Sequence, residues 1–130
     1  MHTVHLSKES FKFSSAHFTV FNASQAERLH GHNYYVSVDL QFSDFDKSTD
    51  LTIDFHKLKK DIQKSCDYLD EYVLIPKNSS FLSYSKIEQH TQIQFSEKRY
   101  LFPDSDIRLL PLANITCEGL CKYLLSLIHI

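Results

Sequence analysis

Three histidines are the residues of this sequence best suited to chemistry. His30 and His32 occur two residues apart in the run Leu29-His30-Gly31-His32-Asn33, and His17 ends the run Phe13-Ser14-Ser15-Ala16-His17. Side chains of an extended segment alternate between its two faces, so His30 and His32 point the same way. With His17 from a neighbouring strand they would give Zn²⁺ three nitrogen ligands and leave a fourth position for water or substrate. That arrangement is typical of a catalytic zinc site.

A plainer interpretation of the same histidines is structural. A histidine beside aromatic residues is commonly a half-buried imidazole with one hydrogen-bond partner, and spacing alone does not distinguish it from a metal ligand. The residues by themselves therefore leave both a metal site and three ordinary imidazoles open.

Two extended segments carry these histidines. From about Val4 to Phe18, the aromatic residues near its end share a face with His17, and a change of phase near Glu9 predicts a β-bulge. From His30 to Phe42, apolar and polar residues alternate, and both histidines are in phase with the apolar positions. The predicted metal face is therefore continuous with a core face.

The rest of the chain predicts two helices and a second pair of strands. After a polar turn region at 43–49, an amphipathic helix capped by Asp54 runs to Leu69, and residues 69–76 lead out of it. A strand over 87–95 and its return at 100–102 enclose a turn at 96–99. A second helix starts near Asn114 or Thr116. This order predicts an α+β fold with a predominantly antiparallel sheet and helices on one face.

Length, charge and cysteines narrow the classes of protein. The 130 residues predict a single domain, 1–130, that can bury a core without disulfides or metal. A net charge of −2 gives no basic surface for nucleic acid or an anionic membrane. Three cysteines without a C-x-x-C pair favour neither disulfides nor a thiolate site, and Cys117 and Cys121 are predicted as small core residues. Without an apolar leader or a membrane-spanning run, we expect a cytoplasmic protein.

Five ordered motifs give the chain a family resemblance. It resembles the 6-pyruvoyl-tetrahydropterin and 6-carboxytetrahydropterin synthases in Phe13-Ser14-Ser15-Ala16-His17, Leu29-His30-Gly31-His32-Asn33-Tyr34, Thr52-Ile53-Asp54-Phe55-His56-Lys57-Leu58-Lys59, Leu69-Asp70 and Asn114-Ile115-Thr116-Cys117-Glu118. The resemblance implies the tunnelling fold, an antiparallel sheet with two helices on one face. In this fold the subunits close into a β-barrel ring, so a homotrimer or homohexamer is expected.

The same resemblance assigns roles to particular residues. It implies that His17, His30 and His32 bind Zn²⁺ and that the substrate is a small pterin. Thr116 matches a position from which the family contacts the pterin, and Glu118 lies nearby, so we expect both to bind substrate. Asp70 matches the aspartate of the family's Leu-Asp-His motif, in which it orients the catalytic imidazole.

The sequence departs from the family where proton transfer is expected. Members that form pyruvoyl- or carboxytetrahydropterin place a cysteine four or six residues before the first histidine of His-Gly-His, where this chain has Ala26 and Ser24. Glu27 instead gives Glu-x-x-His-Gly-His, which resembles the type III variant associated with folate synthesis. That variant converts 7,8-dihydroneopterin triphosphate to 6-hydroxymethyl-7,8-dihydropterin. Glu27 is therefore the expected catalytic base, the alternative being an exposed acid on a loop.

Two further departures keep other functions open. Glu71 stands where the family's Leu-Asp-His motif has its histidine, so the imidazole is lost while Asp70 is kept. The sequence ends at Ile130, before the family's last strand with its pterin-anchoring glutamate. The leading hypothesis is a zinc-dependent pterin lyase. The alternatives are a 6-carboxy-5,6,7,8-tetrahydropterin synthase of queuosine biosynthesis and a catalytically degenerate ring protein that binds zinc or a pterin.

Overall fold

The computed structural model describes residues 1–128, which form two sheets and two helices. Along the chain these are β1 (His2–His17), β2 (His30–Phe42), α1 (Phe55–Leu69), β3 (Tyr72–Pro76), β4 (Ser83–Ile87), β5 (His90–Phe95), β6 (Lys98–Pro103), a 3₁₀ turn η1 (Asp104–Asp106), β7 (Ile107–Leu110) and α2 (Cys117–Leu127). The predicted α+β class is confirmed.

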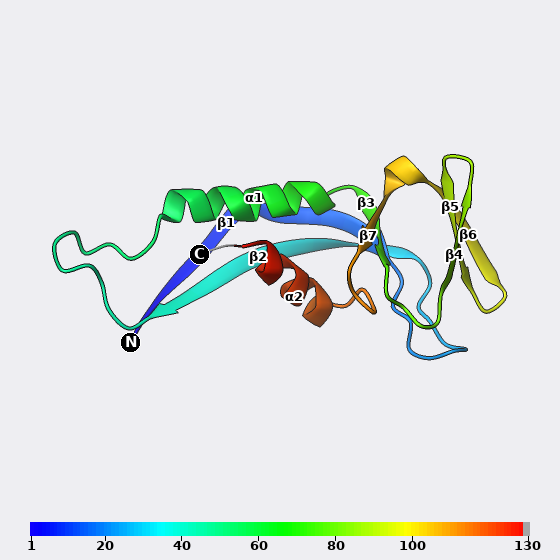
Figure 1. The fold of residues 1–130 in the computed structure, drawn as a ribbon, viewed down its shortest axis with the longest axis horizontal. Helices are drawn as coiled ribbons and strands as arrows, with labels where there is room; N and C mark the ends of the chain where they lie inside the picture. The colour runs from blue at the N-terminus through cyan, green and yellow to red at the C-terminus, as the bar shows by residue number, and fades with distance from the viewer. Residues whose placement is uncertain (129–130) are drawn as a thin grey trace.

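A long antiparallel hairpin of β1 and β2 is the spine of the molecule (Figure 1). Its register runs from His2 opposite Phe42 to His17 opposite His30, so the three histidines meet at one end. The register shifts between Ser7 and Lys12, which confirms the bulge predicted near Glu9.

Both helices pack on one face of this hairpin, as predicted. Asp54 caps α1 by accepting a hydrogen bond from the Lys57 N–H, and Thr116 caps α2 by accepting one from the Gly119 N–H. The buried side chains of both helices share a core with the apolar residues of β1, namely Phe11, Phe13, Leu58, Ile62, Cys66, Leu69 and Leu120. This packing fixes the start of α2 against the histidine end of the hairpin.

Two short parallel strands extend the main sheet and were not predicted. The strand order is β2-β1-β3-β7, with β3 parallel to both β1 and β7. Adjacent residues of β3, Leu74 and Ile75, are both fully buried because cores lie on both faces. A strand covered on both faces has no polar alternation, so residues 72–76 lacked the pattern of a strand.

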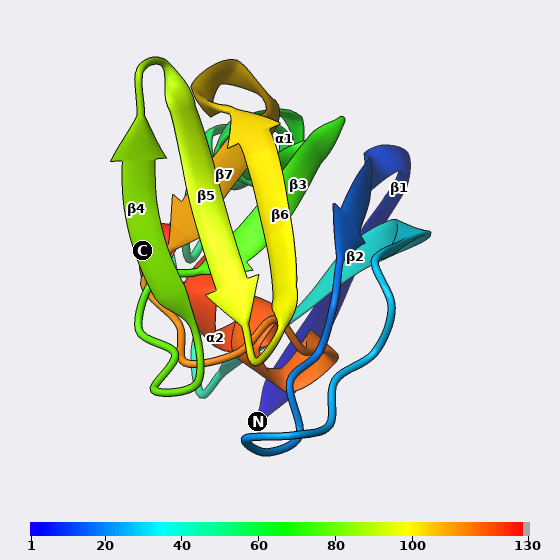
Figure 2. The ribbon, with the colours of Figure 1, turned by 90° about the vertical axis from the view of Figure 1, so that its right-hand side faces the viewer.

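The second sheet corrects one sequence prediction. A single strand over 87–95 is wrong, because a turn at Glu88 and Gln89 separates β4 from β5 in the sheet β4-β5-β6 (Figure 2). Glu88 adopts a left-handed φ of 55° there. Glycine or asparagine usually marks such a turn, and a glutamate gives no sequence signal for it.

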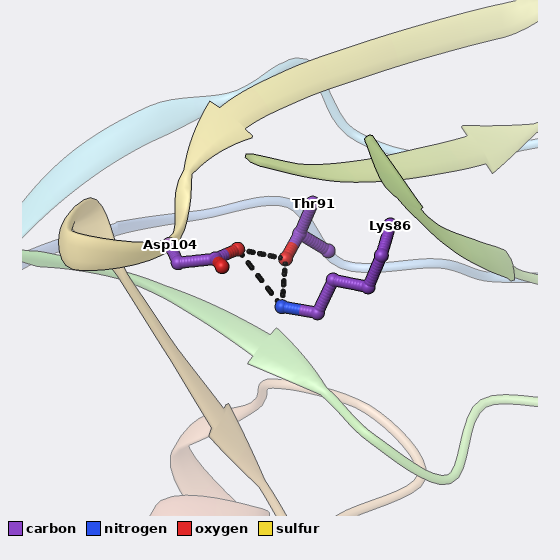
Figure 3. A network of polar contacts seen from close by, with 3 residues as sticks. All are labelled: Lys86, Thr91 and Asp104. Atoms are coloured by element: carbon purple, nitrogen blue, oxygen red, sulfur yellow. Dashed lines mark hydrogen bonds and ion pairs between the residues drawn. The ribbon is translucent and has the colours of Figure 1, made fainter. Parts of the chain in front are cut away.

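A buried threonine joins this second sheet to the turn that follows it. Thr91 is 2% exposed, and its hydroxyl donates to the Asp104 carboxylate at 2.7 Å and accepts from the Lys86 ammonium at 2.8 Å. Lys86 also reaches Asp104 at 2.8 Å, closing a three-membered network (Figure 3). The network links β4 and β5 to η1, directly before β7.

The three cysteines differ in burial. Cys66 is buried, but Cys117 and Cys121 are exposed, so their prediction as core residues is wrong. They lie one turn apart on α2, and the residue of this helix that is fully buried in the core is Leu120. Among residues 1–128, neither helix has the length and apolarity needed to span a membrane.

Candidate metal centre

The three predicted histidines converge at the end of the β1–β2 hairpin. Their ligand atoms all lie within 4.8 Å of one another, close enough for the group to hold a metal ion. His17 ends β1, and His30 and His32 begin β2 on the same face, as their spacing predicted. A set of imidazole nitrogens suits zinc, copper, iron or nickel.

His17 supplies the strongest structural sign of a bound cation. Its Nδ1 lies 3.0 Å from the Ile115 carbonyl oxygen, which accepts the ring N–H and leaves a lone pair on Nε2. Within residues 1–128, this Nε2 is the buried side-chain nitrogen or oxygen that has no hydrogen-bond partner. Burial lowers the pKa of His17, which favours the neutral imidazole that a metal requires. The residues present therefore fit a metal ion.

The other two histidines complete the donor set from β2. Nδ1 of His30 lies 2.6 Å from the Arg28 carbonyl, so this ring also turns Nε2 toward the cluster. Nε2 of His30 and Nε2 of His32 are 2.8 Å apart. The ring of Tyr34 stands edge-on to His32 at 5.7 Å, and burial raises the pKa of its hydroxyl. His32 is exposed, which leaves the cluster open on one side.

Glu27 lies beside the cluster and is held by Thr19, two residues after the end of β1. The Thr19 N–H donates to the Glu27 carboxylate at 3.1 Å, and the Glu27 N–H donates to the Thr19 carbonyl at 2.8 Å. Hydrogen bonding from the Thr19 side chain, and from its backbone, holds the pKa of Glu27 below its ordinary value despite partial desolvation. Glu27 is therefore a carboxylate at neutral pH, able to accept a proton.

The remaining predicted site residues lie at differing distances from the cluster. Thr116 directly follows Ile115, which contacts His17, whereas Glu118 is exposed in the first turn of α2. The Asp70 carboxylate instead accepts the Ser14 N–H at 2.8 Å, at the far end of α1. Ser14 lies three residues before His17, about 10 Å along the strand. Asp70 is thus separate from the histidine cluster within this chain.

Glu71 occupies a strained position beside Asp70. Its φ is 66°, in the left-handed region, and its N–H donates to the Ser14 carbonyl at 2.7 Å. Its side chain lines an open cavity of about 520 Å³ together with Asn33 and Asp106. Residue 71 therefore presents a carboxyl group in place of an imidazole, in a cavity that His32 of the cluster also lines.

Sequence reasoning missed the residues that orient the cluster. The Ile115 and Arg28 carbonyls and Thr19 fix His17, His30 and Glu27. Backbone carbonyls carry no residue-type signal, and a single threonine after a strand is unremarkable in a sequence. Asn114 belongs to one of the family motifs, and its amide donates to the Val20 carbonyl at 2.7 Å and accepts the Val20 N–H at 3.1 Å.

Comparisons with known proteins agree with this geometry. Residues 5–129 match the family described as 6-pyruvoyl tetrahydropterin synthase. A Methanocaldococcus jannaschii protein named "Putative 6-carboxy-5,6,7,8-tetrahydropterin synthase" is 34% identical over 112 residues, which cover 86% of this chain and 68% of that protein.

Solved structures give the same result. The 6-pyruvoyl tetrahydropterin synthase of Plasmodium falciparum superposes with a TM-score of 0.88 at 31% identity, covering 97% of this chain and 76% of that one. The Plasmodium vivax protein, in a form described as a catalytic residue mutant with glutamate replaced by alanine, gives a TM-score of 0.88 at 28% identity and the same coverage.

Proposed function

The chain belongs to the 6-pyruvoyl tetrahydropterin synthase family, and on that premise we propose that it is a zinc-dependent pterin lyase. The proposed reaction cleaves the side chain of 7,8-dihydroneopterin triphosphate and releases 6-hydroxymethyl-7,8-dihydropterin, a folate precursor. One observation carries the proposal: the buried Nε2 of His17, which has no hydrogen-bond partner among residues 1–128, faces two further imidazoles beside a carboxylate that can accept a proton.

Zinc is the metal we propose for this cluster, held by His17, His30 and His32. When bound, Zn²⁺ supplies a Lewis acid for the hydroxyl groups of the substrate side chain. The protein's own contribution is orientation, because the carbonyls of Ile115 and Arg28 fix the tautomers of the first two rings.

Glu27 is the proposed general base. Its hydrogen bonds to Thr19 keep the carboxylate ionised and fixed near the histidines. A thiolate is the alternative base in this kind of site, but Ala26 and Ser24 stand where the family has cysteine. The Plasmodium vivax structure, in which a glutamate is named as catalytic, supports a carboxylate in this role.

Substrate binding is proposed for the start of α2. Thr116 and Glu118 lie one and three residues after Ile115, and a carboxylate such as Glu118 can accept the N–H groups of an aminopyrimidine. Asp70 is proposed as the second functional carboxylate, acting across a subunit boundary in a trimer or hexamer. We place the reaction in the cytoplasm, where the free thiols stay reduced.

Two other functions are each favoured by a specific observation. The name of the Methanocaldococcus jannaschii relative favours a 6-carboxytetrahydropterin synthase, as in queuosine biosynthesis. Glu71 favours a degenerate protein that binds zinc or a pterin without turnover, because a carboxylate at neutral pH cannot replace a donating imidazolium.

One experiment separates these functions. Purified zinc-loaded protein is incubated with 7,8-dihydroneopterin triphosphate, and the products are identified by mass spectrometry. We expect 6-hydroxymethyl-7,8-dihydropterin. Formation of 6-carboxytetrahydropterin would establish the second function. Bound zinc without any product would establish the degenerate one.

A further inference from the structure

Thr19 makes contacts on both sides of the candidate centre. Toward Glu27 it offers two backbone groups: its N–H donates to the Glu27 carboxylate at 3.1 Å, and its carbonyl accepts the Glu27 N–H at 2.8 Å. Toward α2, its hydroxyl donates to the Ile115 carbonyl at 3.1 Å. The hydroxyl therefore gives its one proton to the Ile115 carbonyl, while the backbone of the same residue holds Glu27.

The Ile115 carbonyl joins Thr19 to His17. It accepts the Nδ1–H of His17 at 3.0 Å as well as the Thr19 hydroxyl, so both of its lone pairs are used. Ile115 is fully buried, and the neighbouring Asn114 amide bonds the Val20 backbone. The carbonyl is consequently a fixed point to which a histidine of the cluster and Thr19 are both attached.

We propose that Thr19 is a positioning residue: its backbone holds Glu27, and its hydroxyl fixes that backbone to the Ile115 carbonyl, which in turn orients the His17 imidazole. The part concerning Glu27 as a base rests on the proposed function. The part concerning His17 concerns only the geometry of the cluster. Thr19 itself transfers no proton and binds no metal in this proposal.

The hydroxyl group can be tested separately from the backbone contacts. Thr19→Val keeps the shape and the N–H of the residue but removes the hydroxyl, whereas Thr19→Ser keeps the hydroxyl. Partners that orient metal ligands or catalytic groups are typically worth 10–100-fold in affinity or activity. Thr3→Val, on the exposed start of β1, is a matched control far from the cluster.

The kinetic experiment is a double-mutant cycle with Glu27→Gln. We expect Thr19→Val to lower kcat roughly 10–100-fold with little change in KM, and Thr19→Ser to restore most of it. In the Glu27→Gln background, Thr19→Val should change kcat less than about threefold, because the group it positions has gone. An equal loss in both backgrounds would show that Thr19 does not act through Glu27.

A zinc titration tests the other link without any turnover. Competition with a chelating dye should show that Thr19→Val weakens zinc binding by about tenfold or more, while Thr19→Ser and Thr3→Val stay within about threefold of the parent. Equal zinc affinity in the valine and serine variants would overturn the link to His17. A parent protein that turns over no substrate would refute the proposed function, and this titration would still decide the role of Thr19.

Discussion

The Nε2 atom of His17 is in an unfavourable position unless a ligand reaches it. A buried acceptor without a partner costs about 1–3 kcal/mol, and native proteins seldom leave one so. The Nδ1–H of the same ring already donates to the Ile115 carbonyl. The other tautomer would lose this hydrogen bond and leave Nδ1 without a suitable partner. A cation shared with His30 and His32 removes the cost, which is why the geometry favours a metal.

Removal of one histidine of the cluster should therefore abolish metal binding without changing the fold. His30→Ala takes away one of three donors, while the apolar core contains none of them. We expect zinc content by atomic emission to fall from stoichiometric to near zero, with an unchanged far-UV circular dichroism spectrum. His90→Ala, on β5, is the control. Stoichiometric zinc in His30→Ala would refute the assignment.

Replacement of Glu27 tests its proposed role as the general base. Glu27→Gln keeps the size of the side chain but cannot accept the proton, so we expect kcat to fall by about 10²–10⁴-fold while zinc binding is retained. Glu97→Gln, on the exposed turn before β6, should have no effect. Turnover of Glu27→Gln at the parent rate would remove the main reason for the folate-type reaction.

The pH profile of the parent enzyme follows from the same carboxylate. The base must be ionised, so kcat/KM should fall as pH falls through the pKa of Glu27. Hydrogen bonding from Thr19 lowers that pKa below its ordinary value of 4.5, which puts this decline on the acid side of 4.5. Rates measured from pH 4 to 8 should show no loss attributable to Glu27 above pH 5. A base-type ionisation near 6.5 that Glu27→Gln abolishes would contradict this.

Side-chain types and spacing indicated that the three histidines could form a chelating cluster, and the family resemblance favoured a metal site, but neither predicted the residues that support it. An i, i+2 pair of histidines in a strand has one geometry, so its convergence with His17 follows once the hairpin forms. Glu27 was predicted from a family motif. Its partner Thr19 was not predicted, because the contact between the two residues depends on how the loop between β1 and β2 closes. The bridge of Val20 with Ala26 closes that loop.

Helices and long strands were predicted where local signals are strong. Asp54 caps α1 as predicted, and α2 begins after Thr116, one of its two predicted starts, because side-chain capping depends on residues three apart in sequence. The strands β3 and β7 depend on long-range pairing and were missed. The strand β4 was also missed, because the turn that ends it contains Glu88 in a left-handed conformation and a glutamate gives no sequence signal for such a turn.

The polar network of the second sheet should contribute measurably to stability. Thr91→Val keeps the shape of the buried residue but removes the hydroxyl that joins Lys86 to Asp104. We expect the free energy of unfolding in urea to fall by about 1 kcal/mol, the usual value of one hydrogen bond, with zinc affinity unchanged. If Thr91→Val changed the free energy of zinc binding more than the free energy of unfolding, β7 would transmit strain to the histidine cluster.

Free sheet edges determine how subunits should assemble. Within residues 1–128, β2 has no strand on its outer side, and β1 pairs with β3 only at Ser15 and Ala16. Part of the remaining β1 edge is covered locally, where Gln63 bonds the Ser10 carbonyl and Asp70 bonds the Ser14 N–H. Long unpaired edges promote association, and a closed ring satisfies them without leaving a growing end.

We therefore expect a mass of three or six times the 15.2 kDa of one chain in light scattering at micromolar concentration. Backbone hydrogen bonds between edges are insensitive to screening, so the mass should persist when the salt concentration is raised from 0.1 to 1 M. His30→Ala should assemble as the parent does, since the histidines face the core side of the hairpin and not its edges. A monomeric mass for the parent would refute the ring, and with it the proposal that Asp70 acts across a subunit boundary.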